Sequence, residues 1–218
     1  MPRRYQLYAF PVTIFAHLLF IAVATLMLIW LLKFRQGLAF SSSIQEKLIN
    51  LHTLLMMIGF VLVGGEAIIV HKAFEAKSRS AKVIHMLLHL IALASGILGV
   101  ITIFKAQVVP HHHMLTLHSW FGMIAICSFG LQFMLGFFTY LFPRAEMTTR
   151  ASLKPWHRFI GMVIFLLAVC TAEMGIVERF GLLNLGSSQD GLILNFSGLL
   201  LFLFASSVAL AVILPPYY

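Results

Sequence analysis

The sequence predicts an all-α integral membrane protein, a single bundle of six transmembrane helices spanning residues 1–218. Of these 218 residues, 61% are hydrophobic and only 10% are charged, which leaves too little polar surface to cover a water-soluble globule. Six apolar runs reach the roughly 20 residues that a helix needs to cross a hydrocarbon core of about 30 Å. Because the runs are continuously apolar rather than alternating, we expect helices and not barrel strands.

The six expected spans follow one another through short connections. They cover residues 9–32, 48–70, 83–104, 115–141, 155–177 and 192–214. The first begins after Arg3 and Arg4, as a signal peptide would, but its apolar stretch is long and no small-residue cleavage site follows. We therefore expect it to remain as a span. Pro155 is expected to open the fifth helix, where a missing N–H costs nothing.

Loop charges predict the orientation of the bundle. Six crossings place both termini on one side, and that side carries most of the basic residues: Arg3, Arg4, Lys72, Lys77, Arg79, Lys82, Arg144, Arg150, Lys154 and Arg158. The opposite side carries Lys33, Arg35, Lys47, Lys105 and Arg179. By the positive-inside rule both termini face the cytosol. The formal charge of +8 does not indicate nucleic-acid binding, because the basic residues stand singly in loops.

Four histidines each stand near the start of a different span. The spans alternate in direction, so His52 and His118 are expected at similar depth near the non-cytosolic face, and His85 and His157 near the cytosolic face. An imidazole inside a bundle is costly unless it has a partner. A haem iron takes two axial ligands from opposite faces of the porphyrin, so facing helices must each supply one histidine. The pattern predicts two haems within the four-helix core of spans two to five.

The four histidines are also open to interpretation without haem. Each one alone is consistent with a hydrogen-bonded packing residue. Structural zinc sites need four converging ligands, which two pairs on opposite sides of a bilayer do not supply. Proton relay through histidines and the in-span acids Glu66 and Glu173 would indicate a proton-coupled transporter. A haem-bearing anchor subunit of a larger redox complex is a further alternative.

The remaining polar residues of the spans have less specific interpretations. His89 stands one turn past His85 and is an alternative ligand on the same helical face. His17 and His71 match no ligand motif and are expected to be packing or interfacial residues. Glu66, near the cytosolic end of its span, is expected to pair with a lysine or to accept a proton, and Glu173 has no assigned role.

Five local sequences carry a family resemblance that covers nearly the whole chain. They are Asn50-Leu51-His52, Gly64-Gly65-Glu66-Ala67, Lys82-Val83-Ile84-His85, Leu117-His118-Ser119-Trp120-Phe121-Gly122 and Arg150-Ala151-Ser152-Leu153-Lys154-Pro155-Trp156-His157. Together they resemble the cytochrome b561 family, especially its plant-type ascorbate-dependent members.

The resemblance implies a homodimeric transmembrane oxidoreductase with two haem b groups. Such a protein would take electrons from cytosolic ascorbate and pass them to a non-cytosolic acceptor, either monodehydroascorbate or a ferric chelate. The resemblance also implies that the four motif histidines are the axial ligands, paired as their depths pair them. The membrane implied is an endomembrane, such as that of a vacuole or vesicle, or the plasma membrane.

A cytosolic ascorbate site is expected beside His85 and His157. Ascorbate is a monoanion at neutral pH, and Lys82 stands one helical turn before His85 while Arg150 precedes His157. The resemblance implies that Lys82 and Arg150 hold the substrate. Further candidates on this side are Lys77, Tyr140 and Ala151. These cations are equally explained by topology or by contact with anionic lipid headgroups.

The non-cytosolic substrate site is less well marked. Its candidates are Lys105, Gln107, His113, Thr116 and Asn184. The triplet of His111, His112 and His113 is typical of a metal-binding tract and also of a solvated loop. Plant-type members tend to carry a phenylalanine–histidine pair and a tyrosine in this region, where this chain has Ala106, Gln107 and Leu115. This departure weakens the expectation of a second ascorbate site.

Overall fold

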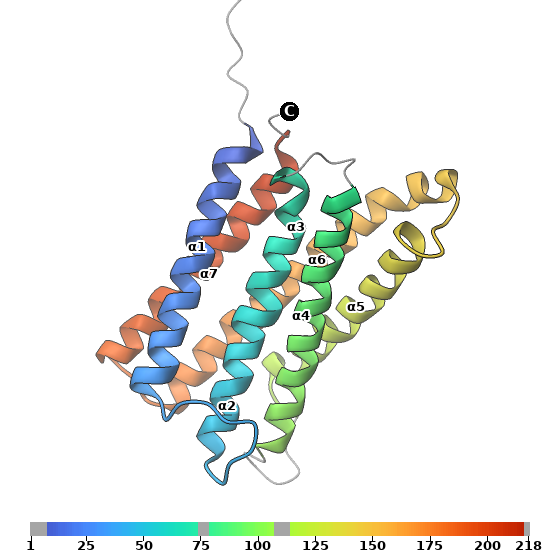
Figure 1. Cartoon of the computed structure of the whole chain (residues 1–218). Coiled ribbons are helices and arrows are strands. Elements are labelled where there is room, and N and C mark those ends of the chain that lie inside the picture. Colours follow the sequence, from blue (N-terminus) through green and yellow to red (C-terminus); the bar gives the residue numbers. More distant parts are fainter. Residues whose placement is uncertain (1–7, 74–78, 107–113, 216–218) are drawn as a thin grey trace, which may run out of the picture.

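The protein is a bundle of long helices, shown in Figure 1. The structure, a computed structural model, describes residues 8–73, 79–106 and 114–215. Its elements are α1 (Ala9–Ile29), η1 (Trp30–Phe34), α2 (Gln45–Leu54), η2 (Leu55–Leu62), α3 (Val63–Ala73), α4 (Arg79–Lys105), α5 (Leu117–Tyr140), α6 (Met147–Leu182) and α7 (Gln189–Ile213). The elements η1 and η2 are π-helical segments that continue α1 and α2 without a break.

Six helical stretches within the described residues are long and apolar enough to cross a membrane. They are Ala9–Phe34, Gln45–Lys72, Arg79–Lys105, Leu117–Tyr140, Met147–Leu182 and Gln189–Ile213. This confirms the predicted all-α bundle with six spans. Large apolar side chains lie exposed along most of them, as a hydrocarbon solvent allows.

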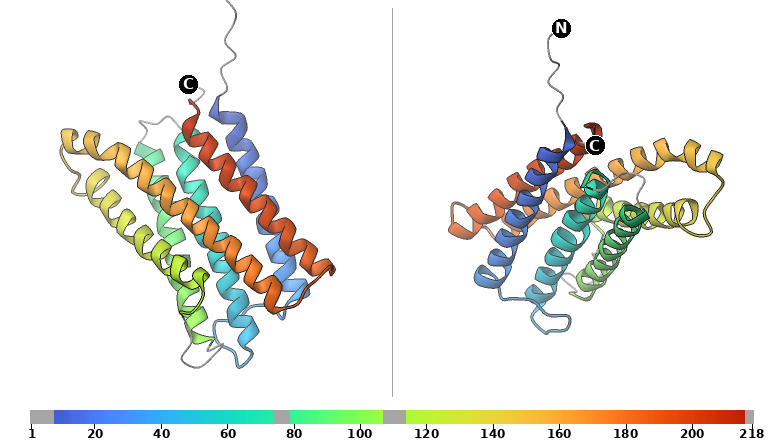
Figure 2. Two further views of the ribbon diagram at one scale, coloured as in Figure 1. Left: turned by 180° about the vertical axis from the view of Figure 1, so that it is seen from behind. Right: turned by 45° about the horizontal axis from the view of Figure 1, so that its top comes forward.

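The helices pack in three groups. Span two (α2, η2 and α3) packs against α4, and α5 packs against α6, while α1 and α7 pair with each other beside them. Two views in Figure 2 show the α1–α7 pair on the side of the bundle away from α5. Buried residues of α1, η2, α6 and α7 form the main apolar cluster.

The connections divide the bundle into two ends. The start of α1, the end of α7, and the helix ends that flank residues 74–78 and 141–146 lie at one end, which we call the terminal end. There the backbone N–H of Ala9 donates to the carbonyl of Pro215 at 2.9 Å. The Lys72 ammonium donates to the carbonyl of Leu214 at 2.6 Å. The ends of η1, α4 and α6 and the starts of α2, α5 and α7 lie at the opposite end.

Pro155 does not open a helix, so that prediction was wrong. The helix α6 begins at Met147 and Pro155 lies inside it. The apolar run identifies the part of the helix that crosses hydrocarbon, whereas the backbone stays helical through the polar residues that precede it. Pro155 leaves the carbonyl of Ala151 without its usual helical donor, a loss that is tolerated where the helix emerges from the bilayer.

Candidate functional site

His52 and His118 face each other near the opposite end of the bundle. His52 comes from α2 and His118 from the first turn of α5, and their ring centroids are 6.3 Å apart. Both rings border a cavity whose lining also includes Met56, Phe60 and Gly122. The prediction that these two histidines share one depth and one site agrees with this geometry.

His85 and His157 form the corresponding pair at the terminal end. His85 comes from α4 and His157 from α6, with ring centroids 6.4 Å apart. Four helical spans, two through five, therefore supply one histidine each. The two pairs have almost the same separation although they stand on different helices.

Three of the four rings are held through Nδ1 by a backbone carbonyl. The partners are Gly99 O for His52 (2.9 Å), Ala67 O for His85 (2.7 Å) and Thr171 O for His118 (2.9 Å). A carbonyl oxygen only accepts, so Nδ1 carries the proton and Nε2 keeps a free lone pair. This is the usual state of a histidine that binds a metal through Nε2.

His157 is held differently, by the side-chain amide of Gln132. The Gln132 Nε2 atom donates to the backbone carbonyl of His157 at 2.7 Å and lies 3.0 Å from its Nδ1. An amide nitrogen only donates, so in this arrangement the ring proton belongs on Nε2. Ligation through Nε2 therefore requires the Gln132 amide to turn over and present its oxygen to Nδ1.

The spacing of each pair fits an iron bound between two imidazoles. With about 2 Å from metal to each nitrogen and about 1.1 Å from nitrogen to ring centroid, two coaxial ligands have centroids about 6 Å apart. The observed 6.3 and 6.4 Å agree with this value. Within residues 8–73, 79–106 and 114–215, no group of three or more His, Cys, Asp or Glu is arranged to hold a metal ion. A haem iron needs only one imidazole from each side, which each pair supplies.

Two glycines leave room for the rings. A Cβ atom added at Gly175 would lie 2.9 Å from Cε1 of His118, and one added at Gly136 would lie 3.1 Å from Cε1 of His157. Each contact is closer than a methyl group tolerates without movement. Gly175 was not predicted as a site residue, because glycine is common in membrane helices and its presence alone is not specific.

Two further histidines flank His85. The ring centroids of His71 and His89 lie 4.9 and 4.4 Å from that of His85. The separation of 4.4 Å is too short for an iron to lie between His85 and His89. His71, which was predicted to be a packing or interfacial residue, packs against His85 from the end of α3.

Basic and hydroxyl groups gather beside the terminal-end pair. The Tyr140 ring lies 5.3 Å from that of His157, and its hydroxyl donates to the carbonyl of Arg150 at 3.5 Å. Lys82 stands in α4 one turn before His85. The Arg150 Nε atom is buried and has no hydrogen-bond partner among the described residues. Ala151 is exposed in the first turns of α6, and Lys77 falls outside the described residues.

Arg158 is a further cation of this site, although it was predicted only as one of the basic residues that set the topology. It follows His157 directly in α6, at the same end of the bundle as His71, Lys72 and Tyr140. Its position immediately after a ligand candidate was the available signal.

The described candidates for a second substrate site lie at or next to helix ends. Thr116 caps α5, where its hydroxyl accepts from the backbone N–H of Ser119 at 3.3 Å. Asn184 follows α6 with a φ of +48°, the left-handed conformation that often ends a helix. Lys105 is the last residue of α4. Gln107 and His111, His112 and His113 lie outside the described residues.

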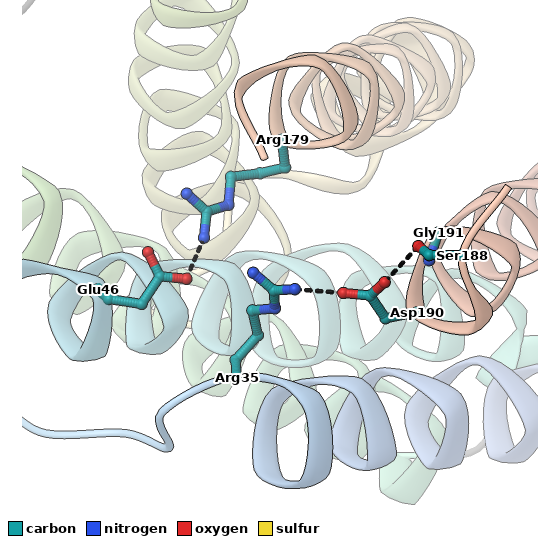
Figure 3. A network of polar contacts seen from close by, with 6 residues as sticks. All are labelled: Arg35, Glu46, Arg179, Ser188, Asp190 and Gly191. Carbon is teal, nitrogen blue, oxygen red and sulfur yellow. Dashed lines mark hydrogen bonds and ion pairs between the residues drawn. The ribbon is translucent and has the colours of Figure 1, made fainter. Parts of the chain in front are cut away.

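Polar groups also tie the helices together at the opposite end (Figure 3). Arg179, at the end of α6, pairs with Glu46 in the first turn of α2 at 2.5 Å. Arg35, after η1, pairs with Asp190 in the first turn of α7. The Ser188 hydroxyl donates to Asp190 at 2.6 Å and accepts from the backbone N–H of Gly191 at 3.2 Å.

The two in-span acids lie outside both histidine pairs. Glu66 pairs with His17 of α1 at 2.7 Å, and not with a lysine of the described residues. Glu173 faces Gly198 of α7, where an added Cβ would lie 2.9 Å from its Oε2 atom. Gly198 thus makes room for this carboxyl group.

Comparison with known proteins shows the family of the chain. The family described as "Eukaryotic cytochrome b561" matches residues 51–181, a range that contains all four paired histidines. The chain is 37% identical to the "Probable ascorbate-specific transmembrane electron transporter 1" of Oryza sativa subsp. japonica, over 95% of this chain and 91% of that protein.

Two further relatives are similar over most of this chain. The "Transmembrane ascorbate ferrireductase 1" of Arabidopsis thaliana is 35% identical over 93% of this chain and 87% of its own length. The "Transmembrane ascorbate-dependent reductase CYB561" of Ovis aries is 37% identical over 89% of this chain and 78% of its own length.

Proposed function

The chain belongs to the eukaryotic cytochrome b561 family, and from that premise we propose that two haem b groups carry its electrons, one at each histidine pair. The protein is an oxidoreductase of the ascorbate ferrireductase type, which performs ascorbate-dependent electron transfer across a membrane. His85 and His157 hold the haem at the terminal end, and His52 and His118 hold the other. The observation that carries the assignment is the matched separation of 6.3 and 6.4 Å.

The terminal end faces the cytosol in this proposal. The support is the concentration of basic residues there, which include Lys72, Lys82, Arg150, Lys154 and Arg158. The acceptor on the other side is monodehydroascorbate or a ferric chelate. The protein acts as a homodimer in an endomembrane or the plasma membrane, as the family resemblance implies.

Ascorbate binds beside His157 through complementary charge. Lys82 supplies a compact positive charge, and the guanidinium of Arg150 has a buried Nε–H without a partner among the described residues, which a ligand oxygen would satisfy. Tyr140 orients Arg150 through its backbone carbonyl. Arg158 adds a further positive charge to the same region. Lys77 and Ala151 complete the proposed site.

The chain's residues set the geometry of the reaction. The ascorbate monoanion loses one electron and one proton, so the product is again an anion that the same cations can hold and release. Haem supplies the one-electron redox chemistry when it is bound. The carbonyls of Gly99, Ala67 and Thr171 keep three ligand rings in the tautomer that offers Nε2.

Purified protein reconstituted into liposomes tests the proposal. With ascorbate inside and a ferric chelate outside, we expect a reduced low-spin haem spectrum followed by chelate reduction. Replacing His118 (His118→Leu) should remove about half of the haem. His17→Gln is the control, because it removes a span histidine outside both pairs and keeps a donor toward Glu66. Full haem content in His118→Leu would falsify the ligand assignment.

A further inference from the structure

An unbroken row of aromatic rings leads from the terminal-end site toward the other site. The ring centroid of His89 lies 4.4 Å from that of His85. Phe129 of α5 lies 5.3 Å beyond His89, and Phe60 of η2 lies 4.9 Å beyond Phe129. Each step is within ordinary contact distance for aromatic pairs.

The row ends at the second histidine pair. Phe60 lines the same cavity as His52 and His118. An α-helix would turn Phe60 about 80° away from the direction of His52, eight residues earlier. The wider turns of η2 reduce that rotation, so both side chains border one cavity.

Glycines on the neighbouring helices let the rings lie where they do. A Cβ added at Gly96 of α4 would lie 3.0 Å from Cδ2 of Phe60. A Cβ added at Gly64 would lie 3.9 Å from Cε2 of Phe129, an ordinary contact. Phe60 lies close against α4 at Gly96, with 5% of its surface exposed.

We propose that His89, Phe129 and Phe60 bridge the two haem sites and carry the electronic coupling between them. The inference rests on the proposed function. One electron leaves the group held by His85 and His157, and one electron arrives at the group held by His52 and His118. No bridging ring is itself oxidised or reduced, and no bond forms or breaks. The rings fill the space between the two haem sites with atoms in contact. This increases the electronic coupling, because electron tunnelling weakens steeply across each gap between atoms.

His89 lies outside both histidine pairs. It cannot share an iron with His85, because their centroids are only 4.4 Å apart. Its Nδ1 atom is buried without a hydrogen-bond partner among the described residues, so hydrogen bonding does not account for its position. What its ring does contact is His85 on one side and Phe129 on the other.

The phenylalanines are tested with the double variant Phe60→Leu and Phe129→Leu in the haem-loaded protein. We expect both haems to be retained with low-spin electron paramagnetic resonance (EPR) signals. After rapid photoreduction, electron equilibration between the sites should be several-fold slower when rates are compared at the driving force set by each variant's measured midpoint potentials. The matched control is Phe165→Leu. Phe165 is also 5% exposed and pairs with Phe204 at 6.4 Å, outside the row. Equilibration as fast in the double variant as in this control overturns the proposal.

His89 is tested by two substitutions that distinguish the effect of an aromatic ring at this position from the effect of the imidazole nitrogens. His89→Phe keeps a ring, so spectrum and rate should both stay near those of the unaltered protein, whereas His89→Leu should slow equilibration several-fold. Loss of the low-spin signal at the cytosolic site in His89→Phe would make His89 a ligand and overturn its role as a bridge. Failure of the proposed function would give a different result from failure of the bridge. In that case the unaltered protein itself would lack two ascorbate-reducible haems.

Discussion

Gln132 contacts His157 twice, at the ring and at the backbone, and it is the one side chain that holds a ligand ring among the described residues. Its Nε2 atom lies 3.0 Å from Nδ1 and 2.7 Å from the carbonyl oxygen of His157. The other three rings depend on backbone carbonyls, which no substitution can remove. Gln132 is therefore the position at which the basicity of one haem ligand can be changed by mutation.

Gln132→Glu should lower the midpoint potential of the cytosolic haem by tens of millivolts. A carboxylate accepts strongly from the Nδ1–H group, makes the imidazole a better donor to iron and so favours the oxidised state. A redox titration followed by optical and EPR spectroscopy measures both haems separately. The non-cytosolic haem is the internal control, and an equal shift in both potentials would contradict a local effect.

Gly175→Ala should displace His118 and reduce the content of the non-cytosolic haem. The added methyl group would stand 2.9 Å from Cε1 of His118. Gly181→Ala in the same helix is the control, because its Cβ would meet nothing within 4 Å. Gly175→Ala in the helix interior favours the helical backbone by about 1 kcal/mol, and Gly181→Ala next to the helix end by less. A loss of haem in Gly175→Ala therefore opposes the gain in propensity and reports the contact with His118. The ratio of haem to protein is the measurement, and equal ratios in the two variants would exclude the steric effect.

Arg179→Glu should destabilise the fold by about 3 kcal/mol, the typical cost of breaking a largely buried ion pair. The side chains of Arg179 and Glu46 are only 14% and 21% exposed, and the reversal would place two carboxylates together. The exchanged pair Arg179→Glu with Glu46→Arg should recover most of the loss. Thermal unfolding in detergent checks this, and no recovery in the exchanged pair would show that charge attraction does not join α6 to α2.

Lys82→Gln should raise the KM for ascorbate about ten-fold, the effect of losing one charged hydrogen bond. The bound anion keeps Arg150 and Arg158, so kcat should change less than KM. Lys105→Gln removes a cation at the other end of the same helix and should leave the cytosolic KM unchanged. Steady-state reduction of the haem by ascorbate measures both variants. A KM in Lys82→Gln equal to that in Lys105→Gln would mean that Lys82 meets lipid headgroups and not substrate.

The end of the bundle at which each paired histidine lies could be predicted, whereas its hydrogen-bond partner could not. The depth of His52 follows from its place in an apolar run and from the charges of the flanking loops, both of which are local properties. The partner of its Nδ1 atom is the backbone carbonyl of Gly99, on another helix. Every residue has such a carbonyl, so no residue type marks the position.

Helix ends were predicted less well for a related reason. The start of α6 was placed at Pro155, eight residues after the observed start at Met147, because hydropathy reports where a helix meets hydrocarbon. It does not report where the backbone stops being helical.

The sequence by itself determined the six spans, the two ends of the bundle and the pairing of His52 with His118 and of His85 with His157. Only the tertiary structure decided which side chains meet between helices. These contacts are Gln132 with His157, the ion pair of Arg179 with Glu46, and the row of aromatic rings that passes through Phe129. The physical reason is that these spans are apolar on nearly every side, so hydrophobicity does not specify the rotation of a helix about its axis. In a bilayer that rotation is set by the close packing of side chains against neighbouring helices.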